Sequence, residues 1–397
     1  MKLSRRGFFV GLGLAIAGLL LKRLRPFPFP RSAGDKLSMR SIRPSTSEGR
    51  SLPPLVFIHG IKGSTLSDAQ GRRRWLTWWQ ALGLASPNLS LPLHWNGDVQ
   101  QRDGLEAIAP LRTVGGFDIY APFLDWAAAS GRAFHAFAYD WRRDNLESAG
   151  KFAEFLKTVS EENGGMKVQV VAHSMGGLIS FVTLNRHPEL FHSVLFAGVP
   201  FGQSISFLED MHAGAANGLN SRILSPHVLF TFVSPYCFFP LEPTKSGLLD
   251  EKRNGILHDW YSAGDWERHK LGIFADTMPT TVTDEQREHL RNALRRAKEF
   301  RLQIVCRKES SFQYPPIAVL ASNTRPTLST VVRDGPHSVR GWDFQTAPKD
   351  AGDNRVAFAE AMPPEGVPRV VHKTSRQHPD LLNDPRQVAA ILAQLRE

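Results

Sequence analysis

The sequence predicts an α/β fold with a mostly parallel central sheet. Short apolar runs of strand length recur along the chain, and several alternate with segments whose apolar residues recur at helical spacing. Parallel strands need a crossover between them, and the helices of such crossovers cover both faces of the sheet. The composition is that of an ordinary globular protein, with 42% hydrophobic and 22% charged residues among 397. The chain can therefore bury a large core, in one elaborate domain or in two.

The first 34 residues have the layout of an export signal. Arg5 and Arg6 precede fourteen uncharged residues, from Phe8 to Leu21, and further basic residues follow. The run Ser-Arg-Arg-Gly-Phe-Phe resembles bacterial twin-arginine signals, whose export machinery would then be a partner. The apolar run is shorter than the ~20 residues that span a bilayer, but no clean cleavage site follows it, so an uncleaved anchor is the alternative. We expect the body of the protein outside the cytoplasm: periplasmic, held at the membrane, or secreted.

The net charge of +10 does not indicate a nucleic-acid-binding protein. Residues 1–34 contain seven Lys and Arg and no acidic residue, which leaves +3 for the remainder. That charge is too small to require a polyanionic partner. The two cysteines, Cys237 and Cys306, allow one disulfide at most, and two free thiols are equally compatible with the sequence.

The expected elements follow a Pro/Ser/Gly/Arg linker at residues 35–50. Buried strands are predicted at PLVFIHG from residue 54, AFHAFAYD from 133, MKVQVVAH from 166 and FHSVLFAG from 191. Helices are predicted at LESAGKFAEFLKTVSEEN and GGLISFVTLNRH. The stretch from about 200 to 300 breaks this rhythm and ends in an amphipathic helix, TDEQREHLRNALRRAKEF, with a capping box of Thr283 and Gln286. The strands IAVLAS and PRVVHK then resume the sheet.

One serine, Ser174, lies in a nucleophile-elbow pattern. The run VVAHSMGGL places it between a strand and a helix, with Ala172 two residues before it and Gly176 two after. The chain turns so sharply in such an elbow that larger side chains at these two positions would collide. The turn presents the hydroxyl at the helix N-terminus, where the amide of Met175 can donate to an oxyanion.

A second oxyanion donor is expected from the loop after the first strand, VFIHGIKGS. Gly60 permits a tight turn there, and the amide of Ile61 would point at a substrate carbonyl. An ordinary glycine turn is the alternative.

A base for Ser174 is expected late in the chain. In this arrangement the acid and then the histidine follow the serine, on loops after late strands. His378 lies in a loop just before the final helix, whereas His372 falls in the last strand. His173 adjoins the serine, but its side chain leaves the elbow in a different direction. We therefore predict His378 as the base.

The acid is expected in the run KDAGDNRVAFAEA. Asp353 lies between a glycine and an asparagine, a turn composition that lets a carboxylate reach an imidazole. It would hold the tautomer of His378 and stabilise the imidazolium. Asp350 and Asp343 are alternates, and a solvent-exposed turn aspartate is the alternative to any catalytic role.

Together these pieces resemble the lecithin:cholesterol acyltransferase family of α/β-hydrolases, in a bacterial form. The motifs span residues 54–395 and occur in the family's order: PLVFIHGIKGSTL, FAYDWRRD, VVAHSMGGL, FAGVPFGQS, YPPIAVLASNTRPTLSTVV, AGDNRVAFAEA and RQHPDLLNDP. The resemblance implies an α/β-hydrolase domain over residues 51–397, with a lid at about 61–115 and a cap insertion at about 203–300.

The resemblance also implies a triad and an oxyanion hole. The triad is Ser174, Asp353 and His378, and the oxyanion donors are the amides of Ile61 and Met175. Two features depart from the family: His59-Gly60 stands where Pro-Gly is usual, and residues 61–115 contain no cysteine for the lid disulfide of its animal members.

The expected lid contains the run RRRWLTWWQALGL. Trp75, Trp78 and Trp79 recur at helical spacing after three arginines, a combination that suits contact with substrate and a lipid interface. Packing of the rings on the cap's own core is an equal alternative.

Asp140 and Arg142 follow a strand end in FAYDWRRD. In the resembled family this region borders the active site. We expect a buried Asp-Arg pair that holds the loop and, with Gly60, supports the active site, in preference to direct substrate contact.

These residues predict a serine esterase that cleaves acyl esters of lipids, phospholipase-like, through an acyl-enzyme. Its partners would be a lipid substrate and a membrane surface. Transfer of the acyl group to a sterol or another alcohol is the runner-up, because the same residues serve both reactions. A noncatalytic lipid-binding protein is a distant third, because every triad position is filled. No cofactor and no metal site are expected, since neither His-Glu-x-x-His nor a Cys/His ligand cluster is present.

Overall fold

The computed structural model describes residues 52–276 and 281–396. The expected export signal at residues 1–34 and the linker at 35–50 lie outside the described residues. Among the helices that the structure does describe, none combines the length and apolar character needed to cross a membrane.

Six parallel strands form the central sheet, which confirms the predicted α/β fold. From one edge to the other the order is β18-β13-β11-β10-β1-β9, and all neighbouring strands are parallel. This order places β10, the strand that leads into Ser174, inside the sheet. The strands are β1 Leu55–Ile58, β9 Phe134–Phe137, β10 Val168–His173, β11 Phe191–Ala197, β13 Ile317–Ser322 and β18 Val370–Thr374.

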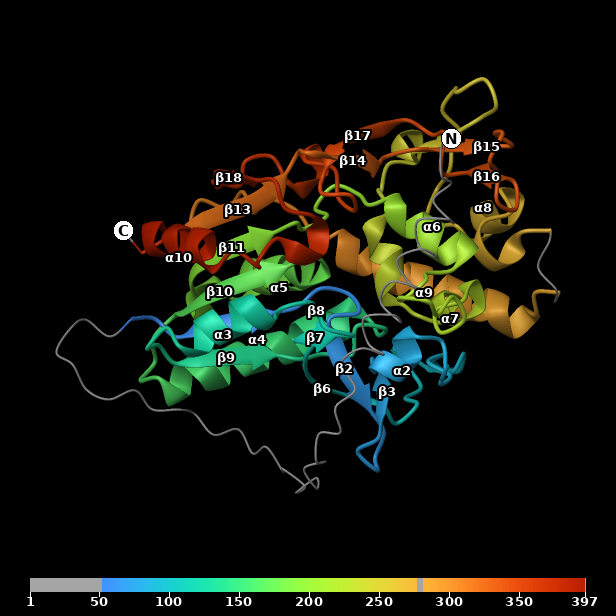
Figure 1. Ribbon diagram of the computed structural model, residues 1–397. Helices are drawn as coiled ribbons and strands as arrows, with labels where there is room; N and C mark the ends of the chain where they lie inside the picture. The colour runs from blue at the N-terminus through green and yellow to red at the C-terminus, as the bar shows by residue number, and fades with distance from the viewer. Residues whose placement is uncertain (1–51, 277–280, 397) are drawn as a thin grey trace, which may run out of the picture. The chain divides into compact units, whose positions relative to one another are not determined.

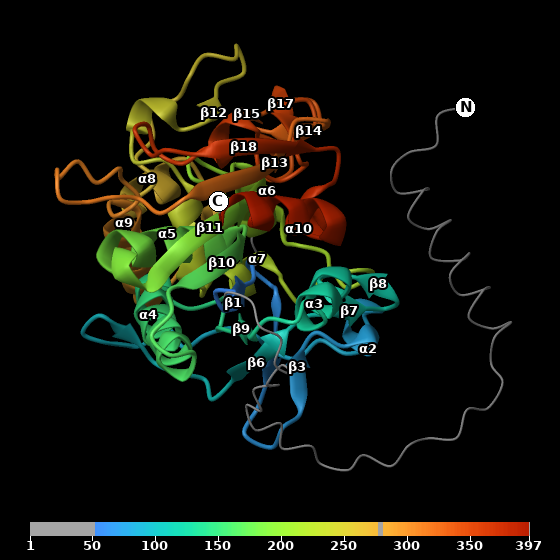
Figure 2. The same cartoon turned by 90° about the vertical axis from the view of Figure 1, so that its left-hand side faces the viewer.

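Helices cover both faces of this sheet, because successive side chains of a strand point to opposite faces. Val56 and Val170 belong to the hydrophobic cluster that contains the apolar side chains of α4 and α5. Phe57 and Val171 belong to the cluster with α3 and α10. Figure 2 shows α4 and α5 on one side of the sheet and α3 and α10 on the other. These helices are α3 Ala121–Ala128, α4 Asn145–Glu162, α5 Met175–Arg186 and α10 Pro385–Gln394.

The expected lid segment, residues 61–115, forms a small antiparallel sheet and one short helix. The sheet has the order β3-β2-β6. Helix α2, Trp78–Ala81, begins with a capping box of Thr77 and Gln80. The strands of this region and the hairpin beside it are β2 Ser64–Ser67, β3 Arg73–Trp75, β4 Trp95–Asn96, β5 Val99–Gln100, β6 Glu106–Pro110, β7 Thr113–Val114 and β8 Phe117–Asp118.

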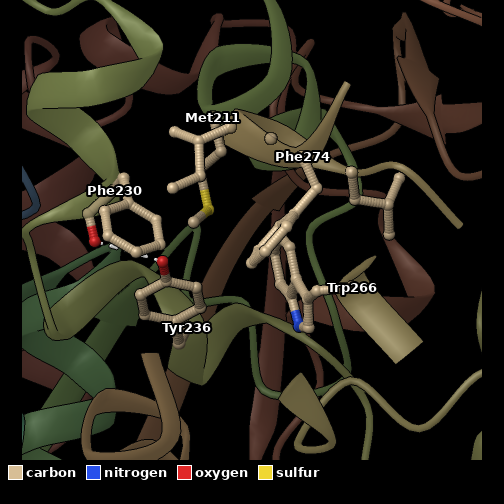
Figure 3. Close-up of a pocket in the computed structure, with 8 residues that line it drawn as sticks. Met211, Phe230, Tyr236, Trp266 and Phe274 are labelled. Carbon is tan, nitrogen blue, oxygen red and sulfur yellow. Dashed lines mark hydrogen bonds between the residues drawn. The ribbon is translucent and has the colours of Figure 1, made fainter. Parts of the chain in front are cut away.

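The regular elements of the expected cap, residues 203–300, are mostly helices. Figure 1 shows its helices grouped beyond one end of the sheet, and Figure 3 shows an apolar pocket to which Met211, Phe230 and Trp266 contribute from three of them. The last helix begins with the predicted capping box of Thr283 and Gln286. The elements are α6 Ser206–Ala213, α7 Pro226–Phe230, η2 Ser234–Phe238, η3 Pro243–Lys245, β12 Leu248–Leu249, α8 Ala263–Arg268, η4 Gly272–Phe274 and α9 Asp284–Arg301.

Hydrogen bonds join the lid segment to the cap. The amide of Leu219 donates to the carbonyl of Ala81 (2.8 Å), and the side-chain amide of Asn220 donates to the carbonyl of Gln80 (2.8 Å). Two small sheets complete the fold: β12 of the cap pairs with later strands in the order β12-β15-β16, and β14 pairs with β17. The remaining elements are β14 Arg325–Leu328, β15 Val331–Arg333, β16 Trp342–Asp343, β17 Lys349–Gly352, and the short 3-10 helices η1 Pro188–Leu190, η5 Ala359–Ala361 and η6 His378–Asp380.

The expected helical stripe of Trp75, Trp78 and Trp79 is wrong at its first member. Trp75 ends strand β3 and pairs with Leu66 of β2, so α2 begins only at Trp78. The Trp75 ring is 1% exposed and packs on Trp141, with 5.2 Å between ring centroids. Strand pairing and burial of a large ring have overridden the helical spacing here.

Candidate active site

Ser174 occupies a sharp turn between β10 and α5. Its φ of 52° and ψ of −127° lie where a non-glycine residue is strained, and such strain is typical of a nucleophile elbow. Gly176 packs against the end of β1: a Cβ there would lie 2.3 Å from the carbonyl oxygen of His59. Only a residue without a side chain fits, as the elbow pattern predicts.

The structure brings Ser174, His378 and Asp353 into one chain of hydrogen bonds. Nε2 of His378 lies 2.9 Å from Oγ of Ser174, and Nδ1 lies 2.7 Å from Oδ2 of Asp353. An ionised carboxylate only accepts, so the ring proton belongs on Nδ1, and the lone pair of Nε2 faces the serine hydroxyl. This is the arrangement in which an imidazole can remove a hydroxyl proton.

The environment of Asp353 keeps its carboxyl group ionised. Oδ1 accepts hydrogen bonds from the amides of Arg355 (2.9 Å) and Val356 (2.7 Å), and the whole residue is 2% exposed. Burial works against the charge, but His378 and these amides outweigh it and lower the pKa of Asp353 below its usual value. The amide of His378 also donates to the carbonyl of Asp353 (2.9 Å), which ties the two loops together.

The alternates for acid and base lie elsewhere. Asp350 is exposed in β17, paired with Thr327, and Asp343 accepts hydrogen bonds from the amides of its own loop. His372 lies in β18, as expected. None of the three has a hydrogen bond to Ser174 or His378 in the part of the chain that the structure describes.

The loop after β1 passes directly against the serine. A Cβ at Gly60 would lie 2.8 Å from Cβ of Ser174, so this position needs glycine. In the described residues, the backbone amides of Ile61 and Met175 donate to no other protein group. Both predicted oxyanion donors are thus available to a ligand.

His59 holds the peptide that carries the Ile61 amide, a role that the sequence did not reveal. Its Nδ1–H donates to the carbonyl of Gly60 (2.7 Å), and its Nε2 accepts from the amide of Tyr139 (3.3 Å). Burial lowers the pKa of His59 to about 4, so the ring is neutral near pH 7. In a trans peptide the carbonyl and the next amide point in opposite directions. Fixing the Gly60 carbonyl therefore fixes the direction of the Ile61 N–H.

Replacing His59 with phenylalanine is expected to lower kcat about tenfold with little change in KM. This effect is smaller than the ~10²–10³-fold loss of kcat that removal of a whole oxyanion donor causes, because the Ile61 amide remains. Phenylalanine can keep the stacking on Tyr139, whose ring centroid lies 4.4 Å away, but it cannot donate to Gly60. Steady-state kinetics on a short soluble ester would measure the effect. His187→Phe, at a position whose side chain is 45% exposed, is the control. An unchanged kcat in His59→Phe would contradict the orienting role.

His173 links the oxyanion loop to the base. Its Nε2–H donates to the carbonyl of His378 (2.9 Å), which can only accept, so its Nδ1 accepts from the hydroxyl of Tyr120 (2.8 Å). The same hydroxyl accepts from the amide of Gly60 (3.1 Å). Burial lowers the pKa of His173 to about 3. Both ring nitrogens are therefore engaged, in agreement with the prediction that His173 is not the base.

Asp140 and Arg142 form the expected buried pair after β9. The Arg142 guanidinium is fully buried and donates to both carboxylate oxygens of Asp140 (2.9 and 2.7 Å). It also contacts both oxygens of Asp103 (2.6 and 3.1 Å) and the carbonyl of Leu89 (2.9 Å), partners that the sequence did not indicate. Burial opposes the charge of Arg142, but the two carboxylates outweigh it and raise its pKa. Arg142 thus ties the lid segment to the sheet.

Replacing Arg142 with alanine is expected to lower the free energy of unfolding by about 3–5 kcal/mol, because two carboxylates lose a shared buried partner. Urea denaturation followed by circular dichroism would measure it. Arg102→Ala is the matched control: its side chain is 58% exposed and pairs with Glu147, so we expect a change of at most about 1 kcal/mol. Equal changes in the free energy of unfolding of the two variants would contradict the role of Arg142 in joining the lid segment to the sheet.

The three tryptophans of the run RRRWLTWWQALGL lie in two different environments. Trp75 packs in the core, whereas Trp78 and Trp79 are 46% and 50% exposed, with their ring centroids 3.6 Å apart. Leu84 is 66% exposed nearby, and Leu219, 60% exposed, is hydrogen-bonded to Ala81 at the end of α2. Trp78, Trp79, Leu84 and Leu219 are therefore the exposed apolar side chains on and beside α2, and we call them the apolar surface around α2.

The two cysteines are free thiols. Cys237 is buried, and its sulfur accepts from the side-chain amide of Asn145 (3.1 Å). Burial raises the pKa of Cys237 to about 12. Among the described residues, three side chains of the cap lie close enough together to hold a metal ion: His258, Asp265 and His269. None of them belongs to the triad.

Comparison with known proteins gives one family match. The model of the family described as lecithin:cholesterol acyltransferase matches residues 93–233, which include Ser174. Lecithin-cholesterol acyltransferase-like 4 of Arabidopsis thaliana is 33% identical over 23% of this chain and 19% of its own length. The lysosomal phospholipase A and acyltransferase of Mus musculus is 24% identical over 44% of this chain and 40% of its own length. The chain thus spans well under half of either relative.

A solved structure shares the fold. The structure of the Tle4-Tli4 complex aligns with a TM-score of 0.53 over 87% of this chain and 98% of that chain, at 13% identity. The TM-score supports the α/β-hydrolase fold, and identity this low supports nothing finer.

Proposed function

Because the chain belongs to the lecithin:cholesterol acyltransferase family, we propose that it is a serine esterase that cleaves acyl ester bonds of lipids, with phospholipids as the first substrates to test. The observation that carries this proposal is the hydrogen-bond chain from Ser174 through His378 to Asp353. Beside it lie the amides of Ile61 and Met175, which donate to no group among the residues that the structure describes.

In the first half of the reaction, Ser174 attacks the acyl carbonyl. Nε2 of His378 takes the hydroxyl proton as Oγ forms the new C–O bond, and the charge on the carbonyl oxygen meets the two amides. The tetrahedral intermediate collapses with cleavage of the bond to the lipid alcohol, which receives the proton from His378. The products are a free alcohol and an acyl ester on Ser174.

In the second half, an acceptor hydroxyl attacks the acyl-enzyme. His378 removes its proton and returns that proton to Oγ of Ser174, so the enzyme is regenerated. Water as the acceptor yields a fatty acid, and an alcohol yields a new ester. Hydrolysis and transfer therefore use the same residues and differ only in the acceptor.

Incubation with phospholipid that carries a labelled acyl chain tests the proposal, with a long-chain alcohol or a sterol present. We expect labelled fatty acid, and labelling of Ser174 by a fluorophosphonate probe. A labelled ester of the added alcohol would identify a transferase instead. Release of neither product, together with no probe labelling of folded protein, would contradict the proposal and favour a noncatalytic lipid-binding protein.

We propose that the apolar surface around α2 rests on the lipid surface. Replacing both Trp78 and Trp79 with alanine is expected to cut activity on phospholipid vesicles about tenfold or more, because partial burial of each ring contributes about 1 kcal/mol. The loss on a short soluble ester should be clearly smaller. Leu302→Ala, 54% exposed at the end of α9, is the control for loss of an exposed apolar side chain. Equal losses on the two substrates would count against interfacial contact.

We further propose that the enzyme acts outside the cytoplasm. The support is the twin-arginine-like sequence of residues 1–34. Cell fractionation with an antibody to the folded domain tests it, and recovery of the mature protein from the cytosol would refute it.

A further inference from the structure

Three potential metal ligands meet in the cap. The ligand atoms of His258, Asp265 and His269 all lie within 4.8 Å of one another. Asp265 is in α8 and His269 directly follows its last residue, so their spacing of four places both side chains on one face of the helix. His258 comes from the loop that precedes this helix. None of the three belongs to the hydrogen-bond network of the triad.

Both ring nitrogens of His258 have no hydrogen-bond partner in the part of the chain that the structure describes. The residue is fully buried. Nε2 of His269 is buried and makes no hydrogen bond of normal geometry with a described residue, although the carbonyl of Leu257 lies near this ring. Buried polar atoms in folded proteins nearly always have a partner, and a bound ion is one explanation for those that lack one. The pattern sets His258 apart from His212 and His289, whose ring nitrogens are all hydrogen-bonded.

The polar groups around His258 are engaged with other partners. Asp265 accepts from the amide of Asp259 (2.8 Å) and from Arg268 (2.8 Å), not from His258. The indole N–H groups of Trp260 and Trp266 donate to backbone carbonyls, although both rings pack around His258.

We propose that His258, Asp265 and His269 bind a Zn²⁺ ion. Two imidazole nitrogens and one carboxylate oxygen form a donor set that zinc uses in proteins, with water in the fourth position. Zinc–ligand bonds are about 2.0–2.2 Å long, so two ligand atoms of a tetrahedral site lie about 3.3–3.6 Å apart once the ion is bound. The ligand atoms here lie within 4.8 Å of one another, so the side chains close by up to about 1.3 Å when the ion binds.

Two arginines border the site and respond to the ion. Arg268 is 67% exposed and can turn to solvent, which leaves Asp265 free to bind. Arg333 donates to Nδ1 of His269 (2.6 Å). A neutral His269 binds the ion either through Nδ1 or through Nε2 with the ring proton moved to Nδ1, so in both cases the guanidinium leaves Nδ1. The bound ion would tie α8 to the loop before it and so stabilise the cap, with no part in the acyl chemistry. The proposal is independent of the proposed esterase activity.

Zinc binding by the purified full-length protein tests this inference. After treatment with a chelator, the wild type is titrated with Zn²⁺ in competition with a colorimetric chelator, and its melting temperature is followed. We expect one tight site per chain and a rise in Tm with Zn²⁺. His258→Gln, Asp265→Asn and His269→Gln should each weaken Zn²⁺ binding more than about tenfold, since even loss of an outer contact costs about 10–100-fold.

His227→Gln provides the matched control. His227 lies in α7 of the same cap, is partly buried, and is not part of the cluster. This variant should bind Zn²⁺ like the wild type. Absence of tight binding by the wild type, or equal affinity in all four variants, would overturn the proposal.

A spectroscopic measurement decides the question if a ligand variant does not fold. Co²⁺ added to the wild type should give the intense visible absorption of a four-coordinate ion with nitrogen ligands, and Zn²⁺ should displace it. A spectrum equal to that of hexaaqua Co²⁺ would also overturn the proposal.

Discussion

Replacing Ser174 with alanine is expected to lower kcat/KM for an acyl ester by about 10⁶-fold while the protein stays folded. The change removes one oxygen atom, the nucleophile, whose partner in the structure is Nε2 of His378 at 2.9 Å. The Ser174 side chain does not cap α5, so the helix keeps all its backbone contacts. Hydrolysis of a short soluble ester measures the rate, and circular dichroism verifies the fold.

Ser180→Ala is the matched control for Ser174→Ala. Ser180 lies in the same helix and is fully buried, and its hydroxyl has no hydrogen-bond partner among the described residues. We expect nearly wild-type activity from this variant. If Ser174→Ala retained more than a small fraction of the activity, an acyl-enzyme on this serine would be excluded.

Replacing Asp353 with asparagine is expected to lower kcat by about 10⁴-fold, by fixing the wrong tautomer of His378. Oδ1 of Asp353 accepts from the amides of Arg355 and Val356, so the amide oxygen of asparagine must take that position. The NH₂ group then faces Nδ1 of His378, which has to accept. The ring proton moves to Nε2, where it blocks transfer from Ser174.

The matched control for Asp353→Asn is Asp350→Asn. Asp350 belongs to the same run of sequence but is exposed in β17. We expect its variant to keep wild-type kcat. The melting temperature provides a further readout. A residue that only stabilises the fold would lower Tm without removing most of kcat. Similar kcat values for the two variants would show that Asp353 does not orient the histidine.

The sheet and the elbow were predictable because their signals are local. Buried parallel strands are continuous apolar runs, and β1, β10, β11 and β13 each coincide with one such run, whereas the edge strand β18 is largely exposed. The elbow at Ser174 requires small residues at fixed offsets, so the constraint is written in neighbouring positions. The Thr283–Gln286 capping box is local in the same way. The lid was less predictable. The position of Trp75 is set by the pairing of β3 with β2, and not by the helical spacing of the tryptophans in its run.

The sequence by itself determined the α/β class, the elbow serine and the pool of residues from which its partners come. Only the tertiary structure decided which acid meets His378, that Asp103 shares Arg142 with Asp140, and that His59 holds the loop of Ile61. It also decided that three cap residues with no familiar spacing meet at His258. The physical reason is range: helix, strand and turn preferences act over a few residues, whereas these contacts join segments whose approach depends on the packing of the whole core.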